Sequence, residues 1–328
     1  MEPKTIVLEG VDRYRVTDPL FECVRVALSY RGEAYSPAYI QGISGAAFRI
    51  AGICPCAPTC SYAMETWDLV KLLGYEMEPL SLWGEGIDPQ TRVHEMVARV
   101  KDEIRAGRPV IVWHAFTMYE WDVVCGYDEE KKQFLGRGSY AGLDGYATAD
   151  QTRMATCIGT SPSFGAILVG EKRGELDSRT AELAALREAV RHAHSRANED
   201  KLGGDEWVML EGLLCYDRWV SDFSKPATTR GPGDAYCLGV YRSTHRAASG
   251  FMRELAPKYP EVAEHLECAA AHFATEADML DQCVELLGWE SPKGPDPERN
   301  ARATTLLSQA RDCYARGIEE TEKALANL

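Results

Sequence analysis

The chain has 328 residues, of which 45% are apolar and 26% are charged, a composition typical of ordinary globular proteins. Its length exceeds that of a typical single domain, so we expect two domains, each able to bury a core of its own. The net charge of -14 argues against a nucleic-acid partner, because duplex binding depends on Lys and Arg side chains that contact phosphates.

The same features predict where the protein works. The first residues carry no basic segment followed by a long apolar stretch, so no secretory signal is expected. No window approaches the roughly 18 continuous apolar residues of a membrane span. Eleven cysteines, an odd number without the spacing of a small disulfide-rich scaffold, favour free thiols in a reducing compartment. We therefore expect a cytoplasmic protein with no membrane partner.

Residues 1–173 are predicted to form an α+β domain. Asp18 and Pro19 begin a helix that ends before Gly32, and a second helix is expected over residues 89–106. Helices followed by antiparallel strands favour an α+β domain over alternating βαβ units. Later segments rich in β-branched and aromatic residues predict strands. These segments are residues 110–113, 121–127, 133–136 and 164–169, and a turn is expected from Asp128 onward.

The rest of the chain, residues 174–328, is predicted to be an all-α domain. Composition changes near Gly170–Gly174, and apolar residues then recur at intervals of three and four, the period of amphipathic helices. No fixed repeat length of the solenoid type appears, so we expect packed helices of a bundle. The aromatic residues of this domain would suit either a lid over a ligand or a homodimer interface.

Cys23 is the first candidate for chemistry. It lies near the N-terminus of a predicted helix, where the positive end of the helix dipole lowers a thiol pKa and favours the nucleophilic thiolate. The neighbouring Glu22 opposes this effect, and the helix starts several residues earlier, at Asp18. The alternative is a buried structural cysteine, as most free cysteines are.

A catalytic thiol needs a base, usually a histidine that a third polar group orients. His94 and His114 are the histidines of the first domain, and His114 is the better candidate because it ends an apolar strand. Glu120 and Asp122, near the same predicted loop, are the candidates for orienting it. The alternative is a structural histidine in the core or at its rim.

Candidates for ligand binding lie on two segments. Tyr119 and Trp121 belong to the loop and strand that follow His114, and connecting loops often carry function. The small residues of Gly42–Phe48, among them Ser44 and Gly45, allow the backbone to approach another group closely. We expect a small-molecule substrate or ligand to contact these residues.

Two segments of the first domain resemble known families. Asp18–Gly32, together with Gly42–Phe48, is similar to the N-terminal domain of the butirosin biosynthesis protein H family. Gly107–Asp128 resembles the bacteriocin-processing, papain-like peptidases. The resemblance covers about the first half of the chain and implies a papain-like fold with Cys23 at the nucleophile position. By analogy it favours acyl transfer in small-molecule metabolism over proteolysis.

Glu120 departs from that pattern, which would place the catalytic histidine directly before Trp121. A carboxylate with an ordinary pKa of about 4.3 is a poor base for a thiol of about 8.5 unless burial raises its pKa. Three interpretations follow. His114 substitutes as the base, Glu120 acts with a raised pKa, or catalysis has been lost and a small-molecule-binding cleft remains.

Cys54, Cys56 and Cys60 form a dense cysteine cluster. Thiolates at this spacing could bind zinc or copper(I), but the paired C-x₂-C units of structural zinc sites are missing and no histidine lies nearby in the sequence. A loop with reduced thiols or a reversible disulfide is the alternative. No phosphate loop, dinucleotide fingerprint or GxSxG motif is present, and we expect no cofactor.

These observations lead to three hypotheses for a papain-like α+β domain followed by an all-α domain. The first is a cysteine-dependent acyltransferase, or an amide or thioester hydrolase, in which Cys23 attacks a carbonyl and His114 is the base. The second is a non-catalytic small-molecule-binding protein that uses the same cleft. The third is a thiol-rich metal or redox protein that uses the cysteine cluster.

Overall fold

The computed structural model describes residues 4–52, 64–83, 86, 88–157, 164–195 and 210–328. The fold is mixed α/β and divides into two compact units. Unit 1 comprises Met1–Pro37 and Glu65–Asp177, and unit 2 comprises Ala38–Met64 and Ser178–Leu328. Within these described ranges, no helix is both long enough and apolar enough to cross a membrane.

Unit 1 is built on an antiparallel sheet, which has seven strands among the described residues. The strand order is β2-β7-β3-β4-β5-β6, and β1 pairs with β4. The strands predicted over residues 110–113 and 121–127 are confirmed as β3 and β4, which pair with each other inside the sheet, and β4 extends one residue further, to Asp128. The strands are β1 (Thr5–Val7), β2 (Tyr75–Ser81), β3 (Val110–Trp113), β4 (Trp121–Asp128), β5 (Gln133–Arg137), β6 (Ala147–Asp150) and β7 (Gly165–Lys172).

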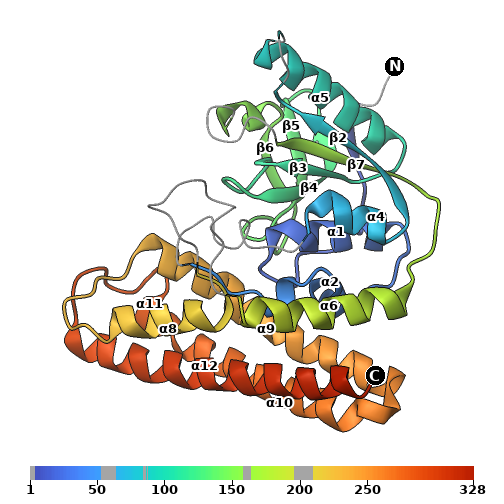
Figure 1. The fold of residues 1–328 in the computed structure, drawn as a ribbon. Coiled ribbons are helices and arrows are strands. Elements are labelled where there is room, and N and C mark those ends of the chain that lie inside the picture. Colours follow the sequence, from blue (N-terminus) through green and yellow to red (C-terminus); the bar gives the residue numbers. More distant parts are fainter. Residues whose placement is uncertain (1–3, 53–63, 84–85, 87, 158–163, 196–209) are drawn as a thin grey trace. The chain divides into compact units, whose positions relative to one another are not determined.

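Helices cover both faces of this sheet. Figure 1 shows α5 (Pro89–Arg105) on one face, and α1 (Pro19–Tyr30) with α4 (Thr66–Leu72) on the other. The register pairs Val112 with Asp122, so these two side chains share a face of the sheet, and the pair Trp113 and Trp121 lies on the other. Asp122 interacts electrostatically with Cys23 of α1, which places the Asp122 carboxyl on the α1 side.

Unit 2 is helical. Its longest helices pack along one another, α9 on α10 and α10 on α12, and α8 packs on α12. The buried positions of these helices are mainly Ala, Leu, Phe and Tyr, and the described elements after Lys172 are helical. Among the described residues its elements are α2 (Pro37–Ile43), α6 (Ser178–Ala193), α8 (Gly212–Phe223), α9 (Pro232–Leu255), α10 (Ala263–Gln282), α11 (Val284–Leu287), α12 (Pro297–Ala326) and three short 3₁₀ segments, of which one is Ala46–Phe48.

The segment Ala38–Met64 falls within the range 1–173 expected for the first domain, but it belongs to unit 2. The Phe48 ring lies 6.1 Å from the Phe251 ring and 5.5 Å from the Phe273 ring, measured between centroids. Gly42 approaches Phe251 so closely that a Cβ there would lie 2.1 Å from Cγ of that ring. These contacts join residues about 200 positions apart, which local sequence patterns do not encode.

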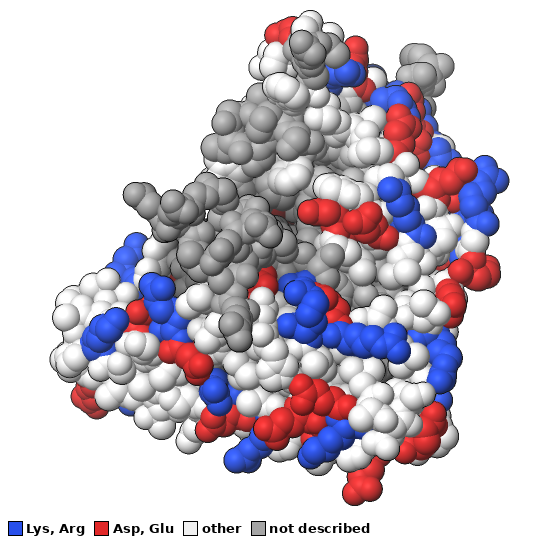
Figure 2. All heavy atoms as spheres, in the orientation of Figure 1, with Lys and Arg blue, Asp and Glu red and all other residues white. Residues whose placement is uncertain are grey.

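The charges on the described surface are mixed. On the face drawn in Figure 2, Asp and Glu side chains lie interspersed with Lys and Arg. Many of them form ion pairs within one helix turn, such as Arg105 with Asp102 and Arg218 with Asp222. Such exposed pairs contribute little to stability, about 0–1 kcal/mol each.

Gly42→Ala tests the packing of the inserted segment. The added Cβ would force the Phe251 ring to move, and overpacking of this kind costs about 1–3 kcal/mol of the free energy of unfolding. Gly239→Ala is the matched control, because Gly239 lies within α9 and has no atom within 4 Å of an added Cβ. There alanine should stabilise by about 0.5–1 kcal/mol. Urea unfolding measures both, and equal effects would contradict the packing.

Candidate functional site

Asp18 caps the N-terminus of α1 with its side chain. Asp18 precedes the helix, and its buried carboxylate accepts hydrogen bonds from the N–H groups of Leu20 (3.0 Å) and Phe21 (3.3 Å). Pro19 is the first helical residue and has no N–H to donate. The predicted helix start is therefore confirmed, and these first-turn amides are not available to a bound anion.

Cys23 lies in the next turn of α1 and is fully buried. Its thiol donates a hydrogen bond to the carbonyl of Leu20, with 3.1 Å between Sγ and the oxygen. Burial raises the pKa of the Cys23 thiol well above its ordinary value, and the charges of Asp18 and Glu22 raise it further. The thiol is therefore protonated at neutral pH in this conformation, whereas a nucleophile requires the thiolate.

Two polar side chains from different parts of unit 1, Tyr14 and Asp122, interact electrostatically with this thiol. Tyr14, which precedes α1, is buried and donates a hydrogen bond from its hydroxyl to the carbonyl of Trp121 at 3.0 Å. Burial raises the pKa of Tyr14 well above its ordinary value, and the nearby Cys23 and Asp122 raise it further. Tyr14, Cys23 and Asp122 thus form one electrostatically coupled group, here called the Cys23 cluster.

Asp122 is the member of the Cys23 cluster that titrates near neutral pH. Its Oδ2 accepts hydrogen bonds from the N–H groups of Phe116 (2.7 Å) and Thr117 (2.9 Å), while Oδ1 is buried without a hydrogen-bond partner among the described residues. Burial raises the pKa of Asp122 to about 7, although the two N–H groups act in the other direction. Because Oδ2 already accepts two N–H groups, the proton of the neutral form belongs on Oδ1.

His114 follows β3 with a positive φ of 60° and is buried. Its Nδ1 accepts a hydrogen bond from the Tyr119 N–H (2.8 Å), and its Nε2 lies 2.9 Å from the Thr156 hydroxyl. That hydroxyl donates to the carbonyl of Arg153, so it accepts the Nε2–H of His114. Burial and the charge of Arg153 lower the pKa of His114. The imidazole is therefore neutral, and its one lone pair is already occupied.

Of the two side chains expected to orient His114, Asp122 bonds elsewhere. Its carboxylate accepts the N–H groups of Phe116 and Thr117, whereas the His114 ring nitrogens bond to the Tyr119 N–H and the Thr156 hydroxyl. Glu120 is buried immediately before β4, and its carbonyl accepts the backbone N–H of His114 at 2.7 Å. The loop between β3 and β4 is thus held by hydrogen bonds at both ends.

The expected ligand-binding residues lie in different surroundings. Trp121 is 3% exposed and packs against Trp113, with 5.2 Å between ring centroids, so it belongs to the core of unit 1. Tyr119 is 44% exposed at the loop. Ser44 and Gly45 belong to unit 2, where the buried Ser44 hydroxyl donates to the carbonyl of Gln41.

The cysteine cluster expected as a weak metal site falls on Cys54, Cys56 and Cys60, which lie outside the described residues. Among the residues that the structure describes, no group of three or more His, Cys, Asp or Glu side chains is placed to hold a metal ion.

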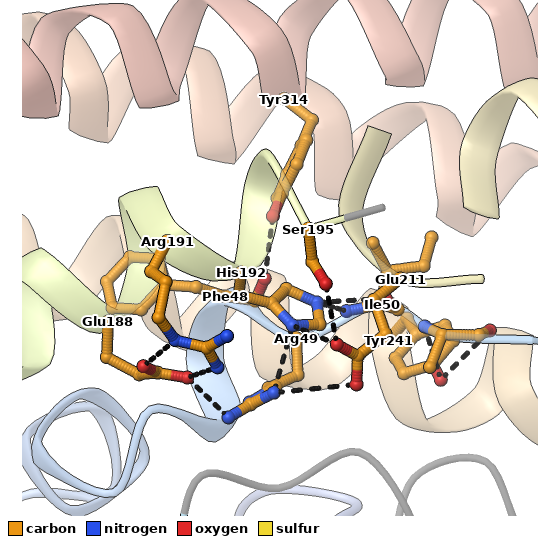
Figure 3. A network of polar contacts seen from close by, with 11 residues as sticks. Phe48, Arg49, Ile50, Glu188, Arg191, His192, Ser195, Glu211, Tyr241 and Tyr314 are labelled. Atoms are coloured by element: carbon orange, nitrogen blue, oxygen red, sulfur yellow. Dashed lines mark hydrogen bonds and ion pairs between the residues drawn. The ribbon is translucent and has the colours of Figure 1, made fainter. Parts of the chain in front are cut away.

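Unit 2 contains a buried polar network around Arg49 that the sequence did not predict. Figure 3 shows the Arg49 guanidinium among Glu188, His192 and Glu211, with Nη2 2.6 Å from a Glu188 oxygen and Nη1 2.9 Å from His192 Nδ1. Because Arg49 can only donate, His192 Nδ1 is an acceptor, and its Nε2–H donates to the carbonyl of Ile50. The one sequence signal for this network is a single Arg within an apolar segment.

His245 carries the opposite protonation state in the same unit. Its Nδ1 lies 2.6 Å from a Glu276 carboxylate oxygen and its Nε2 lies 2.8 Å from the carbonyl of Arg49, so both ring nitrogens donate. Burial lowers the pKa of His245, but the charge of Glu276 and these hydrogen bonds outweigh it, and the net shift is upward. The Tyr216 hydroxyl donates to the same Glu276 oxygen. His245 and Glu276 therefore form a fully buried ion pair.

Comparison with protein-family models and with curated proteins gives no match to this chain.

Asp122→Asn tests the buried carboxyl. The pKa of Asp122 is about 7 when folded, against about 3.9 for an unfolded aspartate, so the folded state binds the proton more strongly. Relative to the asparagine variant, wild-type stability should fall as pH rises from about 4 to 7, by at most about 1.4 kcal/mol per pH unit. Urea unfolding at several pH values measures this. Exposed Asp144→Asn is the control, and parallel profiles for wild type and Asp122→Asn would contradict the shift.

His245→Gln tests the buried ion pair of unit 2. Because the folded pKa is raised, the contribution of His245 is fully present below the ordinary pKa of about 6.5 and is lost as pH rises through the folded value. Wild type should therefore lose stability relative to the glutamine variant as pH rises above about 6.5. Thermal unfolding measures this difference, and His94→Gln, at an exposed position on α5, should leave the wild-type profile unchanged.

Proposed function

We propose that this chain is a non-catalytic small-molecule-binding protein, built on a papain-like α+β unit and a helical unit, in which Cys23 is structural. The observation that carries the proposal is the state of the thiol. Cys23 is buried, protonated and hydrogen-bonded to Leu20 within its own helix. A catalytic cysteine in a helix needs the reverse, a lowered pKa and access to a carbonyl.

The N-terminus of α1 supports the same conclusion. In a cysteine enzyme of this kind, free amides at a helix start favour negative charge on the thiolate and on the developing oxyanion. Here the amides of Leu20 and Phe21 are bonded to Asp18. Asp18 and Glu22 also place negative charge beside Cys23, which disfavours a thiolate.

The candidate bases give further support. The lone pair of His114 is used by the Tyr119 N–H, so removal of a proton from Cys23 would first break that hydrogen bond. Glu120 stands where the resembled families place histidine. A helix that carries a cysteine and packs on an antiparallel sheet is compatible with a papain-like fold, and such a fold without its histidine retains a use in binding.

Cysteine-dependent acyl transfer or hydrolysis is the second candidate, and one observation favours it. Asp122 has a pKa of about 7 and interacts with Cys23, and a carboxyl that titrates near the working pH suits proton transfer. In this candidate Asp122 would take the proton of the Cys23 thiol. The thiolate would attack a carbonyl to give a thioester, and the leaving group would receive that proton.

Thiol labelling distinguishes the two candidates. Under iodoacetamide near neutral pH, with peptide mass spectrometry as the readout, Cys23 should remain unmodified while the exposed Cys268 reacts, because the first is buried and protonated. In urea both should react. Labelling of Cys23 in the folded protein faster than Cys268, or an acetyl adduct on Cys23 after treatment with p-nitrophenyl acetate, would overturn the non-catalytic proposal and support acyl transfer.

A further inference from the structure

A groove of about 600 Å³ lies in unit 1 between strand β2 and helix α5. Its volume is within the usual range of small-molecule sites, about 300–1,000 Å³. Leu80, Trp83 and Met96 supply apolar surface, and Arg92, Glu95 and Arg99 supply charged groups. None of these residues belongs to the Cys23 cluster.

Trp83 gives the groove a flat apolar surface. Its side chain is 64% exposed, and its backbone N–H is bonded to the Ser81 hydroxyl at 3.0 Å, which holds the backbone next to β2. An indole has a large π-face that stacks with planar aromatic rings. A ring packed on Trp83 would remove apolar surface from water, at about 25 cal/mol per Å² buried.

Arg92 gives the groove a positive group with unused donors. Its Nη1 bonds to Glu95 at 3.1 Å, an exposed pair within one helix turn, while its Nε is buried and has no hydrogen-bond partner among the described residues. A buried donor without a partner costs about 1–3 kcal/mol. The Arg92 side chain as a whole is 37% exposed, so an anionic oxygen in the groove can bind its guanidinium through a charge-assisted hydrogen bond.

Arg99, the second arginine of the groove, already forms a two-point ion pair with Glu78. Its two terminal nitrogens bond to the two carboxylate oxygens of Glu78, at 3.0 and 2.7 Å. Arg92 is bonded to Glu95 through Nη1 alone, so it keeps more donors for a ligand than Arg99 does, and it lines the same groove as the exposed indole. A ligand that contacts both Trp83 and Arg92 therefore needs an aromatic ring for the indole and an anionic group for the guanidinium.

From this arrangement we infer that the groove between β2 and α5 binds a small aromatic anion, with its ring on Trp83 and its carboxylate, sulfonate or phosphate on Arg92. The inference rests on the proposed binding function and assigns it a site and a ligand class. An extended peptide added along β2, an outer strand of the sheet as the described residues form it, fits less well, because Pro79 in that strand has no N–H to pair.

Paired fluorescent probes test the inference on the full chain. The anionic probe is 8-anilinonaphthalene-1-sulfonate, and the neutral probe is N-phenyl-1-naphthylamine, which has the same rings without the sulfonate. Fluorescence titration should show saturable 1:1 binding of the anionic probe. Arg92→Met should weaken that binding about tenfold and leave the neutral probe unchanged, because one charged hydrogen bond is lost. Trp83→Ala should weaken both probes.

Matched control variants carry the same changes outside the groove. Trp289→Ala removes an exposed indole of unit 2, and Arg218→Met removes an exposed arginine that is paired within its own helix, as Arg92 is. Both should bind the two probes as wild type does. Equal loss of both probes in Arg92→Met, or binding of the anionic probe that neither groove variant changes, would overturn the inference.

The groove can be refuted without refuting the proposed binding function, and the reverse also holds. Saturable probe binding that is insensitive to Trp83 and Arg92 would refute the groove and leave the non-catalytic binding protein standing. An acyl adduct on Cys23 would refute the non-catalytic proposal whatever the probes show. Cys23→Ala should bind the anionic probe with unchanged affinity, because the groove and the thiol lie on different helices.

Discussion

The Asp18 carboxylate at the start of α1 is the constraint on which the chemistry of unit 1 depends. It occupies the amides of Leu20 and Phe21, the groups at a helix start that would otherwise attract an anion. A thiolate at Cys23 would gain little from the helix dipole and would meet the negative charges of Asp18 and Glu22. The interaction that makes α1 a well-capped helix thus also makes it a poor site for a nucleophile.

The two units satisfy buried ionisable groups in different ways. In unit 1, Asp122 has few positive neighbours, so burial shifts its pKa to about 7 and neutralises it near physiological pH. In unit 2, His245 and Glu276 remain charged because each compensates the other. In both units the polar side chain bonds to backbone, Asp122 to the loop after β3 and His245 to the carbonyl of Arg49. The hydrogen bonds of these buried side chains therefore also hold the backbone segments that they contact in place.

The sheet of unit 1 separates the Cys23 cluster from the groove between β2 and α5. The buried Cys23 cluster lies on the face covered by α1, and α5, which lines the groove with Trp83 and Arg92, covers the other face (Figure 1). A ligand in the groove would contact the α5 side without reaching the thiol. Binding without catalysis then needs no rearrangement of α1, and the protonated thiol and the occupied imidazole of His114 persist in the bound state.

By itself, the sequence determined the local elements, since helix capping and the spacing of apolar residues act over a few positions. It placed Cys23 on α1 and predicted β3 and β4, and the structure bears these out. Only the tertiary structure decided that Asp122 binds loop amides rather than the His114 ring, and that Arg49 meets His192 across 143 positions of sequence. Partner choice and burial depend on contacts between distant residues, and these same contacts set the protonation states on which function depends.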